Sequence, residues 1–236
     1  MDVALFTQEG LIMILRWIHF FAGVAWIGHL YYFNFVQGAF LAEVDAPVKN
    51  ATLAKLAPKA LWWFRWGAMG TFLSGVAMLA IVGKELAGDF FQTPYGIFIF
   101  TGGLLGTIMF LNVWLIIWPN QKIVIASAKQ VAAGGQADPA AAAAAGKAGL
   151  ASRHNTLFSL PMLFFMGAAS HLPAQVNPEY NGKILALVII LIVGLLELNG
   201  IKGKTDTVKI TSIKGVVHMG IFLTVILYVA IELLTK

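Results

Sequence analysis

Apolar residues along the chain are gathered into long continuous stretches separated by short polar segments. Six stretches are long enough for a helix that crosses a bilayer, which needs about 20 mostly apolar residues. They cover residues 10–38, 60–83, 95–118, 155–172, 183–201 and 213–234. This pattern predicts an all-α integral membrane protein, a six-helix transmembrane bundle formed by one domain over residues 1–236.

The longest interruption lies between the third and fourth apolar stretches. Residues 122–133 predict a short surface helix, and residues 134–150 follow as a run rich in alanine and glycine. Gly134, Gly135 and Pro139 are helix breakers. The sequence therefore predicts a flexible Ala/Gly-rich cytoplasmic loop at about 134–150.

Composition supports the membrane assignment and removes several kinds of chemistry. Hydrophobic residues make up 59% of the chain and charged residues only 11%, whereas a soluble domain carries about 25% charged residues. The absence of cysteine excludes disulfides, thiolate metal sites and cysteine nucleophiles. The first ten residues contain acids and no basic segment, so no cleavable signal peptide is expected.

Basic residues alternate between the loops and thereby predict an orientation. The loops after the first, third and fifth stretches are basic: Lys49, Lys55 and Lys59; Lys122, Lys129, Lys147 and Arg153; Lys202, Lys204, Lys209 and Lys214. The opposite side carries only Lys84, Lys183 and Lys236. Basic loops face the cytoplasm, so both termini are predicted on the outer, periplasmic side of a bacterial inner membrane. The net charge of +5 then reflects membrane topology, and no nucleic-acid partner is expected.

This orientation sorts the five histidines into two depths. His19 and His171 fall toward the outer side, and the remaining three, His29, His154 and His218, fall toward the inner side. His19 and His29 cannot bind one haem together, because ten residues separate them by about 15 Å along a helix and roughly 80° around it. Paired ligands of a haem come from facing helices at one depth.

The histidines differ in their neighbours. Small residues lie one turn from His19, His171 and His218, and they leave space for a flat macrocycle or for close helix packing. Trp26, Tyr32 and Phe33 crowd His29, and Arg153 and Asn155 give His154 an interfacial character. His19 with His171 is therefore the favoured pair for the iron of haem b, and His218 with His29 or His154 is the candidate pair for a second haem.

One arginine is predicted at the depth of the outer histidines and one at the depth of the inner histidines. Arg16 lies one turn outward of His19, and Arg65 lies early in the second stretch on the inner side. Each is a candidate partner for a haem propionate through charge-assisted hydrogen bonds. The alternative is that both side chains extend to the lipid headgroups, just as each histidine has the alternative of bonding a neighbouring helix.

Four blocks of sequence resemble one family in one order. They are RWIHFFAGVAWIGHLYYFNF (16–35), PKALWWFRWGAMGTFLSGVAML (58–79), GTIMFLNVWLIIWPNQKIVIASAK (106–129) and SRHNTLFSLPMLFFMGAASHLP (152–173). The chain resembles the N-terminal membrane domain of bacterial cytochrome-c-linked urate oxidases. That resemblance implies urate oxidation with electrons passed to a c-type cytochrome. The membrane part is also loosely similar to bacterial membrane protoporphyrinogen oxidases, a likeness that favours haem at His19.

The chain departs from that family at several points. It contains no Cys-x-x-Cys-His, so the resemblance does not extend to a fused cytochrome domain. Gly67 stands where the family has an acid, and Trp62 stands where it has a histidine. We therefore expect a haem b-binding subunit of a respiratory membrane complex, with a separate c-type cytochrome, other membrane subunits and lipids as partners. The alternatives are a urate or purine oxidase membrane subunit and a structural accessory subunit without a cofactor.

Overall fold

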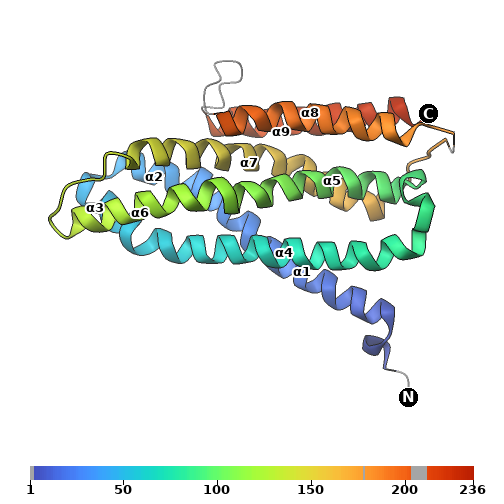
Figure 1. Cartoon of the computed structure of the whole chain (residues 1–236), viewed down its shortest axis with the longest axis horizontal. Helices are drawn as coiled ribbons and strands as arrows, with labels where there is room; N and C mark the ends of the chain where they lie inside the picture. The colour runs from blue at the N-terminus through green and yellow to red at the C-terminus, as the bar shows by residue number, and fades with distance from the viewer. Residues whose placement is uncertain (1–2, 178, 203–211) are drawn as a thin grey trace. The chain divides into compact units, whose positions relative to one another are not determined.

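All regular elements of the described residues are helices in the computed structural model of the chain (Figure 1). The structure describes residues 3–177, 179–202 and 212–236. The helices form two compact units. The first contains Met1–Met78 and Phe110–Arg153, and the second contains Leu79–Met109 and His154–Lys236.

Five helical stretches of the described residues are long and apolar enough to cross a membrane, which makes the chain a multi-pass membrane protein. They are Gln8–Glu43, Ala46–Lys84, Pro94–Ala132, Gly182–Ile201 and Ile213–Leu234. Each contains one of the six predicted stretches. The remaining stretch, 155–172, falls in α7 (Ala141–His171) except for its last residue. α7 is not one of the five, and the polar run Arg153–Thr156 interrupts its apolar sequence. The six-helix count and the outer placement of both termini stay predictions, as does the cytoplasmic side of the basic loops, in which Lys204 and Lys209 lie outside the described residues.

The first three stretches are much longer than a bilayer requires. They contain 36, 39 and 39 residues, or about 54–59 Å of helix against about 30 Å of hydrocarbon. Each is a chain of α-helices joined by a π-helical turn: α1 (Gln8–Tyr31), η2 (Tyr32–Gln37) and α2 (Gly38–Glu43); α3 (Ala46–Ala51), η3 (Thr52–Leu56) and α4 (Ala57–Leu86); α5 (Pro94–Leu111), η5 (Asn112–Ile117) and α6 (Trp118–Ala132). One end of each stretch must therefore project from the membrane. The predicted surface helix at 122–133 is part of such a projection.

The expected loop at 134–150 is shorter than predicted, because α7 begins at Ala141. The helix-breaking residues interrupt only the segment before α7. Gly134 has a positive φ of 86°, and the Asp138 carboxylate accepts a hydrogen bond from the Ala140 amide at 2.8 Å. The Ser127 hydroxyl of α6 accepts a hydrogen bond from the Asp138 amide at 3.0 Å. The alanines that follow have the highest helix propensity of all residues, so they continue as helix once the turn is complete.

Close backbone contact joins α1 to α4 in the first unit. A Cβ atom on Gly67 would lie 2.8 Å from the backbone nitrogen of Trp26 and 3.0 Å from the carbonyl oxygen of Ala22. Further along the same pair, the rings of Phe33 and Phe64 meet edge to face at 5.5 Å. Small residues let membrane helices approach in this way, and the contacts fix α1 and α4 as an antiparallel pair.

In the second unit, α7 lies among α5, α8 (Gly182–Lys202) and α9 (Ile213–Leu234). Glycines of the neighbouring helices face it: a Cβ on Gly102 would lie 3.2 Å from the Met166 nitrogen, and one on Gly220 would lie 2.8 Å from the Leu157 carbonyl oxygen. The Asn155 side chain donates a hydrogen bond to the Met109 carbonyl at 2.9 Å. The polar residues Asn155, Thr156 and Ser159 of α7 are therefore enclosed by protein.

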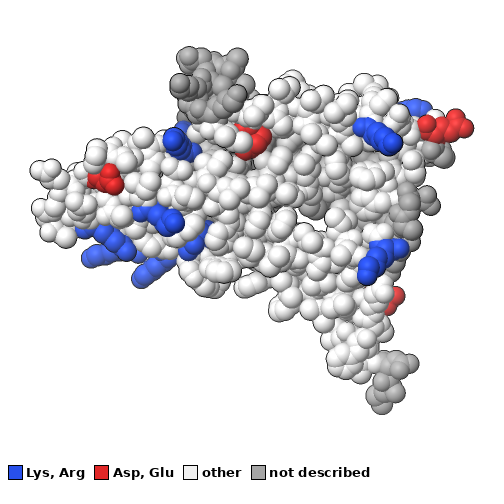
Figure 2. All heavy atoms as spheres, in the orientation of Figure 1, with Lys and Arg blue, Asp and Glu red and all other residues white. Residues whose placement is uncertain are grey.

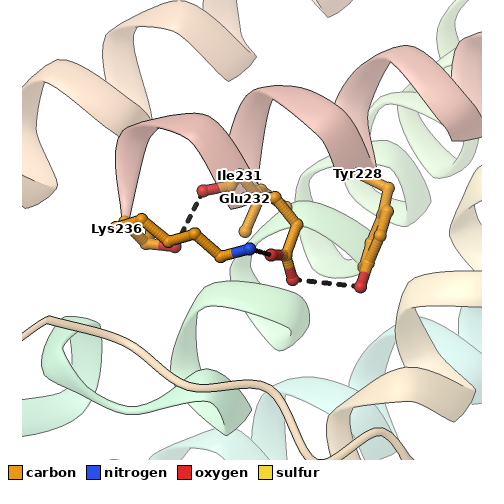
Figure 3. A network of polar contacts seen from close by, with 5 residues as sticks. Tyr228, Ile231, Glu232 and Lys236 are labelled. Atoms are coloured by element: carbon orange, nitrogen blue, oxygen red, sulfur yellow. Dashed lines mark hydrogen bonds and ion pairs between the residues drawn. The ribbon is translucent and has the colours of Figure 1, made fainter.

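Hydrogen bonds join the segment that follows α7 to neighbouring parts of the second unit. The Asn177 amide donates to the Thr235 carbonyl at 2.8 Å, and the Tyr180 hydroxyl donates to the Phe91 carbonyl. At the end of α9, Glu232 accepts a hydrogen bond from Tyr228 at 3.0 Å and pairs with Lys236 at 2.7 Å (Figure 3). The segment after α7 and the last turn of α9 are thus tied together.

Candidate cofactor-binding histidines

His19 lies on α1 with its ring against α4. Its Nδ1 is 3.2 Å from the hydroxyl of Ser74, and that hydroxyl is 2.6 Å from the Gly70 carbonyl oxygen. The hydroxyl has one proton, which the short contact directs to the carbonyl, so its oxygen accepts the hydrogen bond from Nδ1–H of His19. This assigns the tautomer of neutral His19 and leaves the lone pair on Nε2.

The α4 surface beside His19 consists of small residues. A Cβ on Gly75 would lie 3.1 Å from Cε1 of His19, and one on Gly23 of α1 would lie 3.8 Å from Thr71. The α4 side of the imidazole is therefore filled by helix. A ligand of this ring would approach Nε2, the nitrogen that metals and haem iron take when Nδ1–H is bonded elsewhere.

His29 is half-buried at a different level of the same helix pair. Its Nδ1 is 2.7 Å from the Ala25 carbonyl oxygen, which can only accept, so Nδ1 carries the proton here as well. The Phe33 ring lies 6.4 Å away and tilted at 48°. In the antiparallel pairing of α1 and α4, His29 falls near the level of Arg65.

His171 and His218 lie in the second unit and are both exposed. Nδ1 of His171 is 3.0 Å from the carbonyl oxygen of Gly167 one turn back, so His171 repeats the Nδ1–H arrangement of His19. His218 lies in the second turn of α9. His19 and His29 belong to the first unit, and the pairing of His19 with His171 stays a prediction.

His154 is placed differently from the interfacial position that its neighbours Arg153 and Asn155 suggested. Its exposed fraction is 0%, and a Cβ on Gly200 of α8 would lie 2.9 Å from its Cγ atom. The ring fits into this position because Gly200 has no side chain. This packing encloses the ring between α7 and α8, and the role of His154 as a haem ligand stays a prediction.

The two arginines have distinct surroundings. Arg16 is exposed on α1, one turn from His19. Arg65 lies flat over Trp118, with its guanidinium carbon 3.5 Å from the ring centre, and 5.6 Å from the ring centre of Trp114. Nine residues of α4, about 14 Å, separate Arg65 from Ser74. Arg65 is thus at another level than His19.

Several polar residues of α7 and α8 are buried although they are not among the candidate ligands. Asn155, Thr156 and Ser159 have exposed fractions of 0%, while Glu197 and Asn199 of α8 are at least nine-tenths buried. The signal was the polar run Arg153–Thr156 inside an otherwise apolar stretch. Among the described residues, no group of three or more His, Cys, Asp or Glu side chains is arranged to hold a metal ion.

A comparison with known families bears on these positions. A sequence profile described as urate oxidase N-terminal matches residues 86–229, more than half of the chain. The chain belongs to the urate oxidase N-terminal family. No curated protein and no solved structure matches it.

Some of the candidate haem-binding residues lie inside the matched range and others lie before it. His154, His171 and His218 lie inside the part that matches the urate oxidase N-terminal family, whereas Arg16, His19, His29 and Arg65 lie before it. Two of the four resembling blocks, 106–129 and 152–173, are thus covered by the family profile. The match also extends through α8 and into α9, beyond the last resembling block.

Proposed function

We propose that the chain is the membrane subunit of a urate-oxidising system and carries electrons through haem b. The family match supports the first half of this proposal, because its description names urate oxidase and covers most of the second unit. The second half rests on the histidines.

The observation that carries the haem proposal is the bond between His19 and Ser74. A histidine that ligates a metal almost always donates its other ring N–H to a fixed acceptor, which sets the tautomer and the ring orientation. Ser74 supplies that acceptor at 3.2 Å, and Nε2 of His19 keeps its lone pair. His171 has the same arrangement through the Gly167 carbonyl, so His19 and His171 are the residues that would hold one haem.

Arg16 is the arginine that suits a propionate of this haem. It precedes His19 by three residues, which brings the two side chains to the same face of α1. When bound, haem iron supplies reversible one-electron transfer at a potential set by its ligands and their hydrogen bonds. The chain itself holds the imidazoles, fixes their protons on Nδ1 and offers the charge that pairs with a propionate.

A second haem at the inner level would be held by His218 with His29 or His154. His29 has its Nδ1 proton fixed by the Ala25 carbonyl, His218 is exposed, and His154 is enclosed beside Gly200. Histidines at two depths would hold haem at two levels, and bound haem would supply the electron transfer across a bacterial inner membrane. A c-type cytochrome on the outer side is the proposed electron acceptor, within a respiratory complex that includes other membrane subunits.

A second candidate function is catalysis itself, as the membrane part of a urate or purine oxidase. The family name favours it. Position 67 argues against it, because the acid expected there is replaced by a glycine whose Cβ position is filled by the backbone of α1. A structural accessory subunit without a cofactor is the remaining alternative.

Reduced-minus-oxidised spectra of the purified full chain, together with a pyridine haemochrome assay, test the proposal. We expect a b-type signal that is lost in His19→Ala and in His171→Ala. Trp17→Leu is the matched control, because Trp17 is exposed on α1 two residues from His19. A flat spectrum from protein produced with ample haem would refute the haem proposal and favour the accessory subunit.

A further inference from the structure

A cluster of aromatic and basic side chains covers one surface of the first unit. It consists of Trp62, Trp63, Arg65 and Trp66 of α4, Trp114 of η5, and Trp118 and Lys122 of α6, and we refer to it as the Trp–Arg belt. The indoles contact one another in series: Trp62 with Trp63 at 5.0 Å, Trp62 with Trp66 at 6.5 Å, and Trp66 with Trp114 at 5.8 Å between ring centres. Three of them remain half exposed, with fractions of 48% for Trp62, 51% for Trp63 and 48% for Trp66.

Arg65 lies at the centre of this belt with part of its hydrogen-bonding capacity unused. Its Nε donates to the Leu61 carbonyl at 3.2 Å, and its flat face is covered by Trp118 at 3.5 Å. In the described part of the chain, no carboxylate pairs with Arg65 and no acceptor bonds its two terminal nitrogens. A stacked guanidinium with a free edge is suited to bidentate contact with a phosphate.

The two segments that form the belt and the helices next to it carry only basic charges, and the nearest acidic residues in sequence, Glu43 and Asp45, precede α3. Segments 46–66 and 112–132 together carry Lys49, Lys55, Lys59, Arg65, Lys122 and Lys129 and no acidic residue. The two segments pack together, since α6 contacts both α3 and η3. Figure 2 shows basic side chains gathered over the end of the first unit that α3 and α6 form. This surface is complementary to an anionic partner.

The belt lies where a lipid headgroup would meet the helices. Counted from Lys84, about 20 residues of α4 cross the hydrocarbon and end near Arg65; counted from Pro94, the same length ends near Trp114. Tryptophan gathers at this boundary in membrane proteins. Lys122 is one turn further out, with its Nζ 5.8 Å from the ring centre of Trp118. The tryptophan rings and the basic groups of Arg65 and Lys122 therefore lie together near the boundary between hydrocarbon and headgroups.

We propose that Arg65 and Lys122 bind the phosphate of an anionic phospholipid whose acyl chains lie against the exposed indoles of Trp62, Trp63 and Trp66. The lipid belongs to the leaflet on the side of residues 44–60, the side from which α3 and α6 project. Arg65 stays stacked on Trp118 while its terminal nitrogens contact the phosphate oxygens. This site is separate from the proposed haem at His19 and His171.

Titration of the delipidated full chain in detergent with phosphatidylglycerol carrying brominated acyl chains tests this site through quenching of tryptophan fluorescence. We expect saturable quenching by brominated phosphatidylglycerol and much weaker quenching by brominated phosphatidylcholine. Arg65→Gln should weaken the phosphatidylglycerol affinity by about tenfold, the effect of losing a charge-assisted hydrogen bond. Lys122→Gln, an exposed position that does not endanger folding, should weaken it in the same direction.

Lys183→Gln is the matched control, because Lys183 is a basic residue of the second unit and lies far along the chain from the belt. The Lys183→Gln variant should bind phosphatidylglycerol with the same affinity as the unmodified chain. Equal quenching by the two lipids, or unchanged affinity in both Arg65→Gln and Lys122→Gln, would overturn the proposal. The proposal would also be overturned if millimolar inorganic phosphate displaced brominated phosphatidylglycerol as strongly as unbrominated phosphatidylglycerol does. The site would then be one that binds free phosphate.

Discussion

Gly67 of α4 lies directly against the backbone of Trp26 on α1, so closely that a Cβ at position 67 would come within 2.8 Å of the Trp26 nitrogen. Gly67→Ala should therefore force the two helices apart and lower the free energy of unfolding by about 1–3 kcal/mol, the usual cost of overpacking. Thermal unfolding in detergent, followed by circular dichroism, measures the effect. Gly83→Ala, in the same helix but with open space around it, should be neutral or stabilising by up to about 1 kcal/mol; equal behaviour of the two variants would contradict the packing argument.

Ser74 is expected to control how well His19 holds a haem. In Ser74→Ala the Nδ1 proton of His19 loses the Ser74 hydroxyl as acceptor, and haem affinity should fall by about 10- to 100-fold, as for other partners of metal-bound histidines. Haem transfer to an apo-globin acceptor measures this loss. Thr107→Ala is the control, because Thr107 also bonds a backbone carbonyl one turn back in its own helix. Retention of haem by Ser74→Ala at the level of this control would remove the proposed role of Ser74.

The environment of Tyr180 predicts that the free energy of unfolding falls at alkaline pH. Burial raises the pKa of Tyr180, and its hydroxyl must keep its proton to donate to Phe91. Because the folded pKa is above the unfolded value of about 10, the folded chain binds this proton more tightly. The stabilisation is complete below about pH 10 and is lost as the pH rises toward the folded pKa.

Melting temperatures of the chain and of Tyr180→Phe between pH 8 and 11 test this sign. The variant should melt lower near neutral pH and should decline less steeply above pH 10 than the unmodified chain. Parallel curves for the chain and Tyr180→Phe would show that Tyr180 does not contribute.

The predicted topology places residues near both ends of the chain on one side of the membrane. The sequence has no cysteine, so a single introduced cysteine is labelled without background. Thr7→Cys and Lys236→Cys, both at exposed positions, should react with a membrane-impermeant maleimide from the periplasmic side, and Lys129→Cys should react only after the membrane is opened. Labelling of positions 7 and 236 from opposite sides would instead mean an odd number of crossings.

The sequence predicts the membrane helices well and their extensions poorly. The stretches 60–83 and 95–118 were found because hydrocarbon selects long apolar segments, but the same helices continue to Ala46 and Ala132. These extensions are held by contacts between helices, such as those of α6 with α3 and η3, which local patterns do not report. For the same reason the helix through Ala141–Leu150 was missed.

The candidate site was predicted in part. Reading along the chain identified His19 and its small neighbours, but the Ser74 hydroxyl that fixes its tautomer is 55 residues away, so the contact depends on the pairing of α1 with α4. His154 illustrates the opposite case. Arg153 and Asn155 suggested an interface, while the absence of a side chain at Gly200 decides that the ring is fully enclosed.

The position of α7 imposes an order on biogenesis. Asn155, Thr156 and Ser159 are enclosed by protein, yet of the three helices that surround α7 only α5 has left the ribosome when α7 emerges, and α8 and α9 follow later. A polar face of this kind is costly in lipid. A nascent chain that stops before residue 182 would expose it, so α7 should become resistant to protease only after α9 has been synthesised.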